Sequence, residues 1–123
     1  MKSNSLDFEI KFFEGLVKDN PKFIDALIPL AEAYTKKGFH KKGLVVDKRL
    51  ARLRKNDPIV HYNLACSYAL LGQKKEALLA LQKAIRLGYA DFAYLRKDKD
   101  LKSLHNDPAF HSLIPAKVRS FFE

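Results

Sequence analysis

Apolar positions along this chain recur every three or four residues, which is the spacing of amphipathic helices. The pattern predicts helices over residues 6–18, 22–37, 40–55, 59–71 and 74–87. In the third helix, the side chains expected to face inward are Leu44, Val45, Leu50 and Leu53. Residues 59–71 are apolar on nearly every side, and a helix of that kind is covered by several neighbours. We therefore expect an all-α protein.

Two stretches match each other at a spacing of 34 residues without any insertion. The matched pairs are Leu30 with Leu64, Ala31 with Ala65, Tyr34 with Tyr68, and Gly38 with Gly72. Small residues recur where two helices approach closely, large apolar residues where a gap must be filled, and glycine where the chain reverses. A period of this length indicates a repeated helix–turn–helix unit.

The first helix, over residues 6–18, is expected to begin after an N-cap at Ser5, with Asp7 and Glu9 in its first turn. Its end resembles the end of the helix over 40–55. It therefore looks like the second half of a repeat, and we expect it to cap the array at the N-terminal side.

Two Asn/Asp-Pro pairs are predicted to open helices, because proline suits the first helical position after a capping residue. They are Asn20-Pro21 and Asp57-Pro58. Pro29 falls inside the helix over 22–37, where it removes one backbone hydrogen bond. It is expected either to kink the helix or to widen the groove beside it.

After Gly88 the repeat is lost, and shorter helices are predicted. They cover residues 91–98 and 100–105, and a last helix runs from Asp107-Pro108 to about Phe121. The terminal units of a repeat array are atypical because they need a polar outer face. We expect one domain, 1–123, composed of an N-terminal capping helix (6–20), repeat 1 (22–55), repeat 2 (58–88) and a C-terminal capping segment (89–121).

The paired units resemble the tetratricopeptide repeat family. The stretch from Asn63 to Gly72, followed by Glu76-Ala77-Leu78, follows the pattern of that family closely. The segment from Leu87 to Phe110 looks like the segment that closes the array in many bacterial repeat proteins. The resemblance implies antiparallel helix–turn–helix repeats stacked into a short right-handed solenoid with capping helices. It also implies a protein-binding scaffold or adaptor with no chemistry of its own.

Composition adds limits to this picture. The chain has 123 residues, 47% of them hydrophobic and 30% charged, which is ordinary for a globular protein. No apolar run is long enough to span a membrane, and the first residues lack the features of a secretory signal. The single cysteine, Cys66, suits a reducing compartment, so we expect a cytoplasmic protein.

Catalytic and metal-binding patterns do not stand out in the sequence. The five glycines are isolated, and the four histidines do not have the spacing of zinc ligands. His61 and Cys66 lie on diverging faces of one helix, and a lone thiol on a packed helix is usually an apolar filler. We therefore expect no enzyme, no catalytic residues, no cofactor and no metal.

The first helix of each repeat is expected to line a concave groove, which repeat proteins use for extended ligands. The residues predicted by helical phase to contact a partner are Asp25, Ile28, Glu32, Lys36, Ile59, Tyr62, Asn63, Cys66 and Leu70. Tyr62 is the apolar anchor in this hypothesis. The alternative is that Tyr62 packs against the capping helices.

The net charge of +9 favours either a solvated basic surface or attraction to an acidic partner. The predicted partner is thus a protein or peptide, and the chain is expected to be a monomer or a weak homo-oligomer without membrane contact. The alternative function is a basic, nucleic-acid-associated helical protein. Aromatic residues interleaved with arginine would favour it, but most aromatic residues fall on the apolar stripes.

Overall fold

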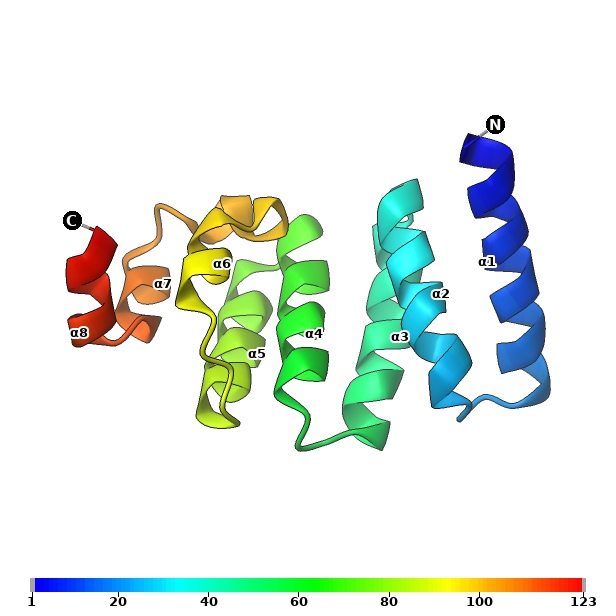
Figure 1. The fold of residues 1–123 in the computed structure, drawn as a ribbon, viewed down its shortest axis with the longest axis horizontal. Helices are drawn as coiled ribbons and strands as arrows, with labels where there is room; N and C mark the ends of the chain where they lie inside the picture. The colour runs from blue at the N-terminus through cyan, green and yellow to red at the C-terminus, as the bar shows by residue number, and fades with distance from the viewer. Residues whose placement is uncertain (1, 123) are drawn as a thin grey trace. The chain divides into compact units, whose positions relative to one another are not determined.

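The computed structural model describes residues 2–122, and every regular element in that range is a helix (Figure 1). The predicted all-α class is therefore confirmed. The chain separates into two compact units, Met1–Lys55 and Asn56–Glu123. Their boundary coincides with the predicted junction between the two repeats.

Unit 1 contains three helices, α1 (Lys2–Asp19), α2 (Ile24–Lys37) and α3 (His40–Leu53). Helix α2 packs against both of the others, and successive helices run in opposite directions (Figure 1). The Tyr34 hydroxyl donates a hydrogen bond to the Glu14 carboxylate, and the Lys37 ammonium lies 2.8 Å from the Asp7 carboxylate. These two contacts tie α1 to α2.

Unit 2 begins with the antiparallel pair α4 (Pro58–Leu70) and α5 (Lys74–Arg86). Ala65, Ala77 and Ala84 are fully buried in this pair, so the small residues of the repeat lie where they were expected. The remaining elements are α6 (Phe92–Lys97), the 3-10 helix η1 (Lys99–Leu104), α7 (Pro108–Leu113), α8 (Ala116–Arg119) and the 3-10 helix η2 (Ser120–Phe122).

Local sequence explains several helix ends. The Asp57 carboxylate accepts hydrogen bonds from the backbone N–H groups of Ile59 and Val60, so Asp57-Pro58 opens α4 as predicted. At the end of α2, Gly38 adopts the left-handed conformation (φ 84°), which turns the chain so that the Phe39 N–H bonds the Tyr34 carbonyl at 2.8 Å. In the second repeat the C-cap of α4 is Leu71, and the matching glycine, Gly72, follows it with φ 75°. The glycine shared by the two repeats therefore lies at the end of the first helix in each.

Two predicted helix starts are wrong. Helix α1 already begins at Lys2, so Ser5 lies within it and Asp7 and Glu9 lie beyond its first turn. Pro21 does not open α2, which begins at Ile24. The Phe23 N–H instead bonds the Asn20 carbonyl at 3.0 Å and closes a turn before the helix.

The phase prediction for α3 is wrong at Val45, which is exposed, whereas Val46 is buried. A helix buries positions three, four and seven apart, and Gly43, Val46 and Leu50 occupy that side of α3. Val45 is displaced around the helix from these residues and points to solvent.

Prolines have different effects inside α2 and near the C-terminus. Helix α2 continues through Pro29. The predicted last helix, by contrast, ends at Leu113 rather than near Phe121. Ile114 adopts an extended backbone (ψ 124°), because a residue before proline avoids the helical region. Pro115 then precedes the separate turn of α8.

Candidate functional site

Four of the predicted contact residues lie on one exposed side of α2. They are Asp25, Ile28, Glu32 and Lys36, and all four are exposed. Their spacing of three, seven and eleven residues from the first keeps them on a single helix face. The buried residues of α2, among them Leu27, Leu30 and Tyr34, hold the opposite side in the core of unit 1.

The predicted contact residues on α4 divide into two groups. Ile59 and Asn63 are exposed, and Leu70 is half-buried. Tyr62 is only 5% exposed, and Cys66 is also buried. The prediction that Tyr62 and Cys66 contact a ligand directly is therefore wrong, and the alternative, that Tyr62 packs against the C-terminal segment, describes the structure.

Tyr62 and Cys66 both donate hydrogen bonds to a buried carboxylate. The Tyr62 hydroxyl lies 2.5 Å from Oδ2 of Asp98, and Sγ of Cys66 lies 3.7 Å from the same oxygen. The other oxygen, Oδ1, accepts the backbone N–H of Asp100 at 3.0 Å. A buried charge is tolerable only where donors satisfy it, and these three donors do so.

Tyrosine rings cover this network. The ring of Tyr62 stacks on that of Tyr89, with centroids 4.3 Å apart and planes 5° apart. The Tyr94 ring lies 6.3 Å from Tyr62 at 47°, and its side chain remains exposed. The Tyr62 ring of α4 is thus packed against the chain that follows α5.

The electrostatics of the network oppose ionisation of its hydrogen-bond donors. Burial first, and then the hydrogen bond to Asp98, raise the pKa of Tyr62. Burial first, and then the charge of Asp98, raise the pKa of the Cys66 thiol. The charge of Asp98 is the first cause of the raised pKa of Tyr94. The thiol is therefore protonated at neutral pH, and a protonated thiol is a poor nucleophile.

The segment that covers this side of α4 is η1. Leu101 and Leu104 are fully buried, and the Ser103 hydroxyl donates to the Ala69 carbonyl at 3.2 Å. The C-terminal segment of the chain therefore occupies the α4 surface on which a ligand was predicted. Of the predicted contacts, the four on α2 and Ile59 and Asn63 on α4 stay accessible.

Three side chains of the network have donor atoms of the kind that bind metals. Sγ of Cys66 and one carboxylate oxygen each from Asp98 and Asp100 lie within 4.8 Å of one another. Sequence spacing could not find this group, because Cys66 and Asp98 lie 32 residues apart. Asp98 and Asp100 belong to the C-terminal capping segment, whose resemblance to array-closing segments was the one sequence feature pointing to this part of the chain. As they stand, Cys66 and Asp98 form a hydrogen-bonded pair with a protonated thiol.

No family model matches this chain. Over 63 residues the chain is 38% identical to a chloroplastic protein from Arabidopsis thaliana. The match covers 51% of this chain and 19% of that protein, so the chain corresponds to a small part of the relative. A partial match of this extent does not show a family. Among the described residues, no helix combines the length and apolar character needed to cross a membrane.

Proposed function

We propose that this chain is a non-catalytic protein-interaction module that binds a protein or peptide through the exposed face of α2. The observation that carries the proposal is the division of α2 into two sides. One side is buried in unit 1, and the other exposes Asp25, Ile28, Glu32 and Lys36 together.

The exposed face of α2 suits a polypeptide ligand. Ile28 is 40% exposed and offers an apolar contact in the middle of charged neighbours. Asp25 and Glu32 would attract basic groups, and Lys36 at the end of the helix would attract a carboxylate. Interfaces of this kind combine an apolar centre with a polar rim.

The family and compartment are part of the proposal. The 34-residue register, the helix pairs and the left-handed glycines at the helix ends support a tetratricopeptide-type scaffold or adaptor. The resemblance of the closing segment to those of bacterial repeat proteins supports a protein of bacterial type. The single cysteine, which is buried and free, supports a cytoplasmic protein, although the plant relative is by its name chloroplastic.

Affinity capture with matched variants tests the proposal. The wild-type chain, the double variant Ile28→Ala with Glu32→Ala, and the control double variant Leu79→Ala with Glu76→Ala would be used to capture proteins from a native lysate. All four substituted residues are exposed, so each variant should keep its helical circular dichroism. We expect the wild type and the control variant to capture at least one protein in similar amounts. The α2 variant should capture less of that protein.

The captured protein is then purified and its affinity measured by calorimetry. The α2 variant, which loses the Ile28 side chain and one charge, should bind the purified protein about tenfold more weakly than the wild type. The control variant should bind it less than about twofold more weakly. Equal binding by all three chains would show that the α2 face is not the site.

A further inference from the structure

The positive charge of the chain is concentrated in one stretch. Residues 36–55 hold nine of the 23 basic side chains and a single acidic residue, Asp47. The rest of the chain has 14 basic and 13 acidic residues, so this stretch accounts for +8 of the net charge of +9. Asp47 is buried, and the surface of this stretch is therefore strongly basic.

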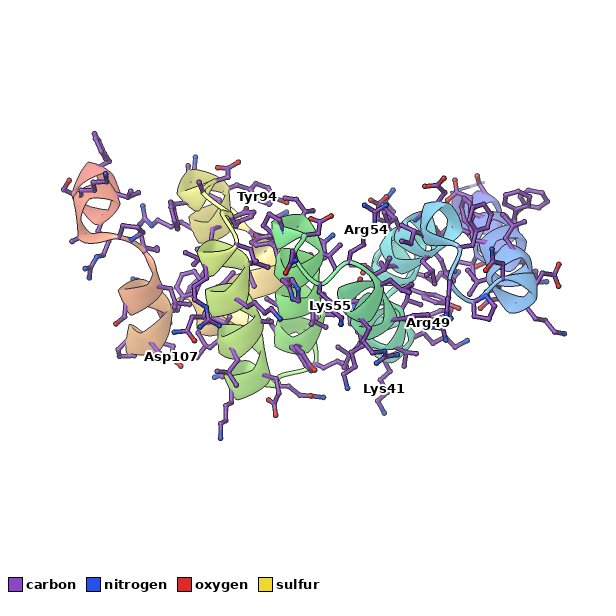
Figure 2. All side chains as sticks on the ribbon, turned by 90° about the horizontal axis from the view of Figure 1, so that it is seen from below. Lys41, Arg49, Arg54, Lys55, Tyr94 and Asp107 are labelled. Carbon is purple, nitrogen blue, oxygen red and sulfur yellow. The ribbon has the colours of Figure 1, made fainter. Side chains whose placement is uncertain are left out.

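Helix α3 presents much of this charge along one side. Lys41, Lys48 and Arg52 are exposed and lie seven and then four residues apart, which places them on one helix face. Val45 lies between Lys41 and Lys48 on the same face. We call Lys41, Val45, Lys48 and Arg52 the basic row. Lys42 and Arg49 flank it, and Figure 2 labels Lys41 and Arg49 together with Arg54 and Lys55 at α3 and its C-terminal end.

The row is held by a rigid element. The opposite side of α3 is buried, with Gly43, Val46 and Leu50 in the core of unit 1. Lys41 and Arg52 lie eleven residues apart, so the row is about 17 Å long and matches about three turns of a partner helix.

Val45 indicates which class of anion fits the row. It is 57% exposed at the centre of the three cations, so a ligand that covers the row must also cover an apolar side chain. Single-stranded nucleic acids stack their bases on aromatic side chains. None of the four residues of the row is aromatic, and the exposed Phe39 at the N-cap of α3 lies under the Lys42 ammonium, 5.3 Å from its ring centroid. An anionic membrane takes up the apolar side of a basic helix, but that side of α3 is buried.

We propose that the basic row is a second binding surface, which takes an acidic helix of a partner protein. The partner helix would place carboxylates opposite Lys41, Lys48 and Arg52 and one apolar side chain against Val45. The row shares no residue with the α2 face formed by Asp25, Ile28, Glu32 and Lys36. The two surfaces can therefore be tested separately, and failure of one does not imply failure of the other.

A designed peptide is the direct probe. It is a labelled helix that repeats the spacing of the row, with glutamate opposite each cation and leucine opposite Val45. A second peptide replaces that leucine with glutamine, and poly-uridylate and phosphatidylserine vesicles represent the other polyanions. Fluorescence anisotropy, or sedimentation for the vesicles, gives each Kd for the full chain at several salt concentrations. We expect the leucine peptide to bind most tightly, and more weakly as salt is added.

Charge reversal identifies the surface. The row variant is Lys41→Glu with Lys48→Glu and Arg52→Glu. The control variant is Lys74→Glu with Lys83→Glu and Arg86→Glu, which changes the net charge equally at exposed positions of α5. We expect the row variant to weaken peptide binding by about tenfold or more, and the control by less than about threefold.

A second pair of variants tests the apolar contact. Val45→Ala should weaken the leucine peptide about two- to fivefold and leave the glutamine peptide unchanged. Leu79→Ala is the control, because Leu79 lies 34 residues further on and is 58% exposed. Circular dichroism checks folding, and Lys41→Gln with Arg52→Gln replaces the row variant if the latter loses helical signal.

Three results would overturn the proposal. The first is tighter binding of poly-uridylate or the vesicles than of the leucine peptide, with loss in the row variant, which would make the row a nucleic-acid or lipid surface. The second is equal loss in the row and control variants, which would show attraction to net charge alone. The third is equal binding of the two peptides, which would remove Val45 from the surface.

Discussion

Asp98 is a buried carboxylate whose two oxygens accept hydrogen bonds from Tyr62, Cys66 and the backbone of Asp100. At the scale of single residues, this explains why a tyrosine and a cysteine stand on the side of α4 that faces η1. The phenol and the thiol donate hydrogen bonds to a carboxylate that the fold has removed from water. The raised pKa values of Tyr62 and Cys66 follow from that arrangement, with burial as the first cause.

The stability of the protein should consequently fall at alkaline pH. In the unfolded chain a thiol ionises at about pH 8.5 and a phenol at about pH 10, whereas the folded protein keeps both protons. A group whose pKa is raised by folding stabilises the protein fully below its unfolded pKa, and this contribution is lost as the pH rises above that value. We expect the free energy of unfolding to fall above about pH 8.5, by up to about 1.4 kcal/mol per pH unit for each such group.

Tyr62→Phe is the matched variant for this prediction. At pH 7 it should lower the free energy of unfolding by about 1–3 kcal/mol, because Asp98 loses a donor. Above about pH 10 its stability should fall less steeply than that of the wild type, since one titrating group is gone. Urea denaturation followed by circular dichroism measures both effects. Parallel pH profiles for the two proteins would contradict this account of Tyr62.

At the scale of elements, the two repeats use the same positions with different side chains. Gly43 in α3 occupies the position of Ala77 in α5, which is fully buried. A Cβ atom at Gly43 would lie 3.7 Å from Oγ1 of Thr35 and 3.7 Å from Cβ of Tyr34, which are ordinary contact distances. The space at this helix contact therefore admits alanine.

Gly43→Ala should raise the free energy of unfolding by about 0.5–1 kcal/mol, because alanine restricts the unfolded chain and favours helix. Gly38→Ala is the control with the opposite sign. Gly38 has φ 84°, a conformation that costs a residue with a side chain about 1–2 kcal/mol. Urea denaturation of the two variants and the wild type tests the pair. A loss of stability in Gly43→Ala would mean that α2 and α3 are packed more tightly than the structure indicates.

At the scale of the whole molecule, the chain forms two compact units, and unit 2 depends on residues beyond the repeat. Leu95, Leu101, Leu104, Phe110 and Ile114 all come from the C-terminal segment and are almost completely buried. The closing segment therefore supplies a large part of the core of unit 2 in addition to covering α4.

Leu101→Ala tests this dependence. Leu101 has no exposed surface, so the substitution should cost about 2–5 kcal/mol of unfolding free energy and leave a cavity beneath η1. Cys66 should then react faster with a thiol reagent, because opening of η1 uncovers it. Leu79→Ala, at an exposed position, should change stability by less than about 0.5 kcal/mol. An unchanged rate of Cys66 labelling in Leu101→Ala would show that η1 does not control access to the thiol.

Sequence pattern alone determined the helical class, the two helix–turn–helix pairs, the small residues between α4 and α5, and the glycines at the helix ends. These features follow from contacts within a few turns of helix, and such contacts appear in the sequence as a period. The same logic predicted the exposed face of α2. It failed at Val45, because the phase of α3 is set by its packing on α2.

Only the tertiary structure decided the fate of Tyr62 and Cys66. Helical phase can say that two side chains share a face, but it cannot say what lies over that face. Here the cover is η1, and the carboxylate that precedes it, Asp98, lies 32 residues from Cys66. No short-range period connects such residues. The burial of Tyr62 is therefore a property of chain folding, and the accessible candidates for partner binding are those on the faces that the closing segment leaves open.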